Sequence, residues 1–197
     1  MLRLFVAIEI PADVRGHMHQ IQNKLGPAAE SVRWVAADHF HLTLKFLGST
    51  DPDRVAEITA RLKNLAARHH GFELELLGVG AFPSAHKPRV LWVGTRGELA
   101  PLKKLARELD REMEAFGYKV EGRLFQGHLT LGRIKVPRVN PRLEKSLTAL
   151  AGARIGRIQV QDFCLFQSEL HRSGPIYHVL DRFRLQSQTF QGKLEEV

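Results

Sequence analysis

Hydrophobic and polar residues alternate in several short stretches of this chain, which is the pattern of half-buried β-strands. The alternation and the content of β-branched residues predict strands over residues 2–10, 32–35, 41–47, 72–82, 89–95, 128–134, 155–166 and 176–185. In the segments between them, apolar residues recur every three or four positions, as on one face of a helix. These stripes predict helices within residues 14–25, 55–65, 99–116 and 143–150.

The order of the predicted elements repeats along the chain. The succession strand, helix, strand, helix, strand runs through residues 2–82 and again through 89–166. We therefore predict a single bilobal domain over residues 1–197, of the α/β (α+β) class. It has two lobes of mainly antiparallel sheet with outer helices, related by a pseudo-two-fold axis around a central cleft. Residues 176–185 are predicted to supply a closing strand, and the strand near 89–95 to close the first lobe and open the second.

The tetrapeptide His-Leu-Thr-Leu occurs twice, starting at His41 and at His128, which are 87 residues apart. The similar apolar tetrapeptides that begin at Leu4 and Leu91 are separated by the same 87 residues. The shared spacing indicates a duplicated unit, in which each half carries one copy of the motif.

Composition and length are those of an ordinary globular protein, with 197 residues, 44% hydrophobic and 25% charged. The apolar run from Leu4 to Ile10 is too short for a signal sequence or a membrane span, so we expect no membrane association. The only cysteine, Cys164, has no partner for an internal disulfide, which fits a reducing compartment. We expect a cytoplasmic monomer.

The formal net charge is +8, and the positive charge is concentrated in one segment. Residues 133–157 contain seven lysines and arginines and a single acidic residue, Glu144. Such a segment favours a polyanionic partner such as nucleic acid, although a solvated basic surface would have the same composition.

The repeated motif carries groups suited to acid and base catalysis. Because side chains alternate along a strand, His41 and Thr43 share one face, as do His128 and Thr130, while the leucines occupy the other face. Two histidines on opposite sides of a phosphodiester can activate water and protonate the leaving oxygen, each transfer being worth roughly 100-fold to 10,000-fold. Threonine hydroxyls can donate to the non-bridging phosphate oxygens. A single copy of the motif would equally suit an ordinary strand.

Neighbouring residues add candidates. On a regular strand Arg133 would face away from His128, but Gly132 would permit a bulge that brings Arg133 to a bound phosphate; a surface ion pair is the alternative. Lys45 is in phase with the first motif and is a weaker candidate for the same role. Four aromatic residues near the motifs are able to stack on a base, but core packing is expected for each: Trp34, Phe40, Phe46 and Trp92. No histidine pair has metal-ligand spacing, so neither a metal nor another cofactor is predicted.

Several segments together resemble a known family. They are RLFVAIEIP, VRWVAADHFHLTLKFLG, AFPSAHKPRVLWVG, HLTLGR and SELHRSGPIYHVL, and they span nearly the whole chain. In these segments the sequence resembles the 2H phosphoesterases, and more narrowly the bacterial and archaeal RNA 2',3'-cyclic phosphodiesterases, historically called 2'-5' RNA ligases.

The resemblance implies a bilobal enzyme without a metal that hydrolyses RNA 2',3'-cyclic phosphate ends to 2'-phosphomonoesters, with 2'-5' ligation as a secondary activity. By motif, His41 would be the proton donor and His128 the proton acceptor, while Thr43 and Thr130 would hold the phosphate. One departure is that relatives often have proline before the second motif histidine, where this chain has Gly127. Two alternatives remain: a phosphodiesterase acting on small cyclic nucleotides, and a module that binds RNA ends without turning them over.

Overall fold

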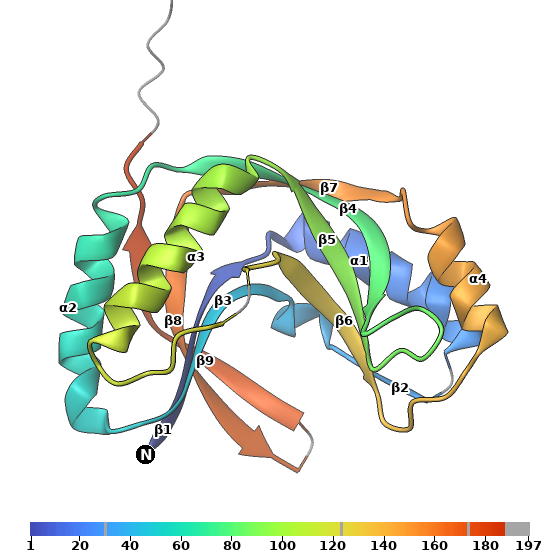
Figure 1. The fold of residues 1–197 in the computed structure, drawn as a ribbon, viewed down its shortest axis with the longest axis horizontal. Coiled ribbons are helices and arrows are strands. Elements are labelled where there is room, and N and C mark those ends of the chain that lie inside the picture. The colour runs from blue at the N-terminus through green and yellow to red at the C-terminus, as the bar shows by residue number, and fades with distance from the viewer. Residues whose placement is uncertain (30, 123, 173, 188–197) are drawn as a thin grey trace, which may run out of the picture.

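The computed structural model describes residues 1–29, 31–122, 124–172 and 174–187, which form two antiparallel sheets flanked by helices (Figure 1). The first sheet has four strands in the order β3-β1-β8-β9. The bounds of these strands are Leu2–Glu9 for β1, His41–Thr50 for β3, Asp162–His171 for β8 and Gly174–Arg184 for β9.

The second sheet has five strands in the order β2-β6-β5-β4-β7. Their bounds are Val32–Trp34 for β2, Phe72–Phe82 for β4, Val90–Gly97 for β5, His128–Ile134 for β6 and Arg154–Val160 for β7. Every pairing between the strands of both sheets is antiparallel, as predicted.

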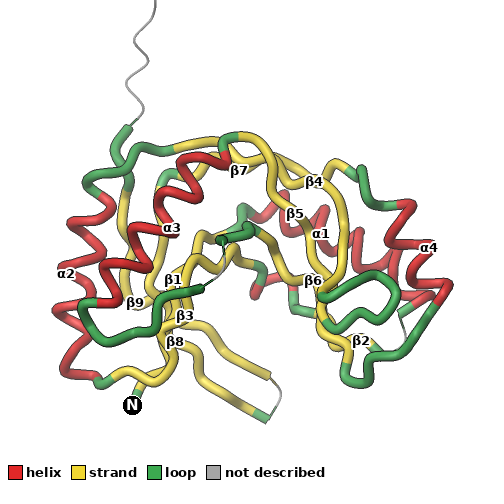
Figure 2. Tube along the Cα trace, viewed as in Figure 1, coloured by secondary structure: helices red, strands yellow, loops and turns green. Residues whose placement is uncertain are grey.

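Two helices cover each sheet (Figure 2). The helices are α1 (Ala12–Leu25), α2 (Val55–Ala66), α3 (Leu99–Glu114) and α4 (Pro141–Ala149). In the first lobe, α2 packs on β9 and α3 on β3; in the second, α1 packs on β7 and α4 on β4. The predicted bilobal fold with outer helices is confirmed. Among the described residues, no helix is both long enough and apolar enough to cross a membrane.

Local signals fix where two of these helices begin or end. The side chain of Asn140 accepts a hydrogen bond from the backbone N–H of Leu143 and so caps α4, which has Pro141 in its first turn. After α3, the chain turns at Gly117, whose φ of +81° is a conformation that glycine adopts without strain. These are signals that sequence inspection can recognise.

The two lobes are linked because some strands and helices pack on a different sheet from the strand that precedes them in the chain. After β1 in the first sheet, α1 packs on the second, and after β5 in the second sheet, α3 packs on the first. The strand expected to link the lobes, near residues 89–95, is β5, and it pairs only within the second sheet. That expectation is wrong, because the chain changes sheet on entering β2, β3, β4 and β8, and β5 makes none of these changes.

The strand predicted over residues 155–166 is also wrong, because it is two strands. β7 ends at Val160, opposite Phe72 in the second sheet, and β8 begins at Asp162, opposite Arg184 in the first. Only Gln161 lies between them. An apolar pattern indicates that residues are buried, but not in which sheet. The pattern therefore continues across the change of sheet and predicts one strand where there are two.

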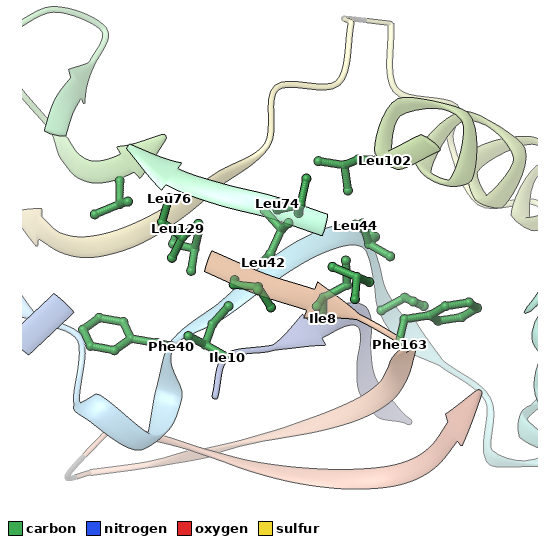
Figure 3. Packing of buried hydrophobic residues seen from close by; sticks show 14 of the residues in the cluster. Ile8, Ile10, Phe40, Leu42, Leu44, Leu74, Leu76, Leu102, Leu129 and Phe163 are labelled. Atoms are coloured by element: carbon green, nitrogen blue, oxygen red, sulfur yellow. The ribbon is translucent and has the colours of Figure 1, made fainter. Parts of the chain in front are cut away.

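One hydrophobic core joins the two lobes. Leu42 and Leu44 from β3 belong to the same buried cluster as Leu129 and Leu131 from β6. Figure 3 shows Leu42, Leu44 and Leu129 close to Leu74 of β4. Because the motif strands share a core, their relative position is fixed by packing on both sides of the lobe boundary.

Candidate active site

The two motifs have the same alternation of burial. Their four leucines are at most 5% exposed, whereas His41, Thr43, His128 and Thr130 are partly exposed. The predicted division of each motif strand into a leucine face and a His-Thr face is therefore observed. Strands β3 and β6 also contact each other across the lobe boundary. The two motifs thus lie on strands of different sheets that contact each other, with their polar side chains turned away from the common core.

Both imidazole rings are oriented by a backbone carbonyl two residues earlier. The Nδ1 atom of His41 lies 2.8 Å from the carbonyl oxygen of His39, and the Nδ1 atom of His128 lies 2.8 Å from that of Gln126. Since a carbonyl only accepts, each Nδ1 carries the hydrogen, which leaves Nε2 as the nitrogen that can exchange a proton with a substrate.

The two histidines differ in their surroundings. His41 lies among aromatic rings, with centroid distances of 4.9 Å to Phe5, 5.3 Å to Tyr177 and 6.3 Å to Phe166. Burial lowers the pKa of His41 to about 4, partly opposed by the hydrogen bond to the His39 carbonyl. The ring of His128 meets Phe82 edge-on, at 5.1 Å between centroids.

A β-bulge follows the histidine and threonine in each motif strand. In β3, Thr43 lies opposite Ala7 and Lys45 opposite Val6, so Leu44 has no partner. In β6, the corresponding pairs leave Leu131 without a partner. Because a bulge adds one residue, it exchanges the two faces for the residues that follow.

The bulges have opposite effects on the two cationic residues that were candidates for binding phosphate. Arg133 is exposed after two consecutive buried residues, which returns it to the face of His128 and Thr130 as the Gly132 hypothesis required. The same shift turns Lys45 inward, where its side chain is only 1% exposed. Lys45 is therefore not available to a phosphate, and that candidate role is wrong.

Lys45 instead ties the first motif strand to the chain that leads into the second. Its ammonium forms an ion pair with Asp110 of α3 and donates a 2.9 Å hydrogen bond to the carbonyl of Lys119. The other carboxylate oxygen of Asp110 accepts from the backbone N–H of Glu121 at 3.0 Å. Nearby, Tyr118 donates to Thr50 at the end of β3, at 2.9 Å. These contacts fasten the segment before His128 to β3 and α3.

The glycine before the second motif histidine has a steric explanation. A Cβ atom at Gly127 would lie 2.4 Å from Oγ1 of Thr95, well inside van der Waals contact. That hydroxyl donates a 3.0 Å hydrogen bond to the carbonyl of Gly127. In this chain Thr95 occupies the space of a side chain at position 127 and fixes the backbone there.

The equal spacing of the two apolar tetrapeptides is not a structural register. The residues opposite the motif threonines are Ala7 and Trp92, which are 85 residues apart rather than 87. The difference of two residues is one full period of a strand, so the faces are preserved while the pairing is shifted.

The aromatic candidates separate into packed and exposed side chains. Phe40 is 3% exposed and Trp34 packs on the core, so the expected core packing holds for these two residues. The ring of Trp92 lies 5.1 Å from that of Phe82. Phe46 is 62% exposed and follows the bulge in β3, which contradicts the expectation that it is buried. Its ring is 6.0 Å from that of Phe5, which in turn contacts His41.

The basic segment 133–157 does not form a single surface. Arg154 and Arg157 on β7 lie near Glu75 and Glu73 of β4, at 3.8 Å and 3.6 Å. Arg133, by contrast, lies on the motif strand β6. The count of charges alone did not distinguish the cation beside the motif from those paired at the far edge of the sheet.

Several residues around the histidines were not found from the sequence. Tyr177 of β9 lies against His41, and the positive charge of Arg133 from the other lobe opposes the rise in the Tyr177 pKa that burial causes. Phe5, Phe82 and Thr95 also contact the motifs or the residues beside them. Their positions depend on strand pairing, for which the sequence contains no local signal.

The fold and the paired motifs define a class of enzyme. The family model described as LigT like Phosphoesterase matches residues 8–92 and again residues 93–177. The chain belongs to this family of phosphoesterases, and the prediction of family and enzyme class is confirmed. The double match also agrees with a duplicated chain, while the repeat limits 2–82 and 89–166 stay a prediction.

Among individual relatives, the chain is 35% identical to the RNA 2',3'-cyclic phosphodiesterase of Aeropyrum pernix, over 84% of this chain and 93% of that protein. It is 34% identical to the protein of the same name from Archaeoglobus fulgidus, over 92% and 99%. The crystal structure of Escherichia coli LigT complexed with 3'-AMP superposes with a TM-score of 0.75 at 29% identity, covering 94% of this chain and 98% of that one.

Proposed function

We propose that this protein hydrolyses RNA 2',3'-cyclic phosphate ends to 2'-phosphomonoesters. The observation that carries the proposal is the pair of motif strands β3 and β6, which contact each other and expose one histidine and one threonine each. The relatives named as RNA 2',3'-cyclic phosphodiesterases supply the substrate class.

The geometry supports a two-histidine displacement in the cleft predicted between the motif strands. The Nε2 atom of His128 takes a proton from water, and the hydroxide attacks phosphorus. The bond from phosphorus to the 3'-oxygen breaks, and Nε2 of His41 gives its proton to that oxygen. Thr43 and Thr130 donate to the non-bridging oxygens, and the guanidinium of Arg133 neutralises their charge.

The assignment of His41 as proton donor and His128 as proton acceptor follows from the family resemblance. It requires that His41 be protonated when it acts. A proton donor must carry its proton when the substrate is bound, yet the pKa of His41 in the free protein is lowered to about 4. An anionic phosphate beside the ring favours the charged imidazolium and raises that pKa. We therefore propose that His41 becomes protonated when the substrate binds.

The test is incubation with an RNA that ends in a 2',3'-cyclic phosphate, followed by identification of the oxygen that keeps the phosphate. We expect a 2'-phosphate, activity that persists in a chelator, and losses of at least 100-fold in His41→Ala and in His128→Ala. A 3'-phosphate product would reverse the choice of leaving oxygen. Full activity in both single variants would overturn the mechanism, and tight binding without product would favour an RNA-end-binding module.

Three further expectations belong to the same proposal. Ligation to a 2'-5' linkage is the same displacement with the 5'-hydroxyl of a second RNA end in place of water, and it is expected only at high concentrations of RNA ends. The protein is expected to act as a monomer, because each of the two motifs lies in the same chain. A cytoplasmic location is expected from the buried single thiol of Cys164.

A further inference from the structure

Two arginines lie directly opposite each other beside the second motif. Arg33 of the edge strand β2 pairs in register with Arg133 of β6, and both side chains are exposed. Residues directly opposite in an antiparallel pair extend from the same face, with Cβ atoms about 4.5–5.5 Å apart. Arg33 is therefore on the face that carries His128, Thr130 and Arg133.

Among the described residues, neither of the two guanidinium groups has a carboxylate partner. Within residues 1–29, 31–122, 124–172 and 174–187, no ion pair or hydrogen bond involves the side chain of Arg33 or of Arg133. Like charges placed directly opposite on a sheet are unfavourable. By contrast, Arg154 and Arg157 on the far edge of this sheet each have a glutamate within 4 Å. The Arg33–Arg133 pair is thus a concentration of positive charge that no described carboxylate neutralises.

Both arginines extend toward the other lobe. A terminal nitrogen of Arg33 lies 3.3 Å from the position of a Cβ atom on Gly174, at the start of β9. Arg133 acts electrostatically on Tyr177 of the same strand, and the Tyr177 ring contacts His41. The two cations therefore lie between the second sheet and β9, beside the catalytic groups, and Arg33 is one strand farther from His128 than Arg133.

We propose that Arg33 binds a second phosphate of the substrate, the internucleotide phosphodiester next to the cyclic phosphate. Arg133 serves the cyclic phosphate itself, as the proposed function requires, and Arg33 is one strand spacing, about 4.8 Å, beyond it. An RNA chain presents successive phosphates that must each be neutralised, and a guanidinium binds phosphate through two parallel hydrogen bonds. An anion between the arginines also removes their mutual repulsion.

The consequence is a preference for the ends of RNA chains over mononucleotides. A nucleoside 2',3'-cyclic phosphate has a single phosphate and leaves Arg33 without a ligand. A dinucleotide with the same end engages both arginines. This inference rests on the proposed function, because it assigns the cyclic phosphate to Arg133 and the two histidines.

The experiment compares Arg33→Gln with the unmodified protein on two substrates, a nucleoside 2',3'-cyclic phosphate and a dinucleotide with the same cyclic end. We expect kcat/KM for the dinucleotide to fall about tenfold or more and kcat/KM for the nucleoside to change less than twofold. The slope of log affinity against log salt for the dinucleotide is expected to fall by about 1. Arg154→Gln, on the opposite edge of the same sheet, makes the same change in charge and is expected to leave both values unchanged.

Equal losses on both substrates, or an unchanged value for the dinucleotide, would overturn the role of Arg33. If the unmodified protein cleaves neither substrate, the proposed function fails instead. Binding of a dinucleotide that ends in a 2'-phosphate then still tests Arg33, because an unchanged salt slope in Arg33→Gln would exclude the second phosphate site. Thermal unfolding of both variants verifies that the exposed substitutions leave the fold intact.

Discussion

The hydroxyl of Thr95 donates a 3.0 Å hydrogen bond to the carbonyl of Gly127, immediately before His128. The next carbonyl toward the N-terminus, that of Gln126, lies 2.8 Å from Nδ1 of the His128 ring. One residue of β5 therefore fixes the backbone from which the ring of the proposed proton acceptor is oriented. Thr95 is a positioning residue, since it acts on the histidine only through the main chain.

Gly127→Ala is expected to destabilise the protein by about 1–3 kcal/mol, because the new methyl group would displace the hydroxyl of Thr95. Denaturant unfolding measures this change. Gly122→Ala lies in the same connecting segment with open space around its Cβ position and serves as the control. Adding Thr95→Ala to Gly127→Ala removes the closest contact, that with Oγ1, and leaves the 3.0 Å contact with Leu102. A double variant no more stable than Gly127→Ala would therefore contradict the role given to the Thr95 hydroxyl.

The protonation of His41 is expected to depend on bound phosphate. In the free protein its pKa is lowered to about 4 by burial, so the ring is neutral at pH 7. An NMR titration of the ring should show this midpoint, and an RNA ending in a 2'-phosphate should move it upward. Because the folded protein binds this proton less well than the unfolded chain, His41 makes folding less favourable as pH falls from about 6.5 to 4. A midpoint unaffected by the product would argue that His41 is not the donor.

Lys45→Met is expected to cost about 3–5 kcal/mol of folding free energy, because it leaves Asp110 without its buried counter-charge. Chemical denaturation measures the loss. The matched control is Lys104→Met, since Lys104 and its partner Glu108 are 56% and 28% exposed and 4.0 Å apart. A pair of that kind contributes about 0–1 kcal/mol. Similar losses in the two variants would show that the Lys45 contact is not a buried ion pair in solution.

Phe46→Ala is expected to raise KM for an RNA substrate several-fold, with little effect on stability, because the side chain is 62% exposed beside the site. Stacking of a base on an aromatic ring contributes about 1–3 kcal/mol. Phe40→Ala removes a ring that is 3% exposed and is expected to cost about 3–5 kcal/mol of stability. Steady-state kinetics and thermal unfolding of the pair separate binding from packing, and an unchanged KM in Phe46→Ala would exclude stacking there.

Prediction from the sequence succeeded where a structural rule acts locally. Helix stripes and strand alternation located the elements, and the strand over residues 72–82 matches β4 exactly in its bounds. It failed where two distant segments had to be paired. The segment predicted as one strand over 155–166 forms two strands in different sheets. The bulges in β3 reversed the expected orientation of Lys45 and Phe46.

The sequence by itself determined most of the elements, the duplicated His-Thr motif and the family, because periodicity and motif identity can be recognised within a local segment. Only the tertiary structure decided which strands meet, and with that the environment of each proposed catalytic group. His41 is surrounded by aromatic rings from β1, β8 and β9, and Arg33 lies opposite Arg133 only because β2 pairs with β6. Strand register depends on packing between distant segments, so charge balance and desolvation at the site follow from the fold and not from local pattern.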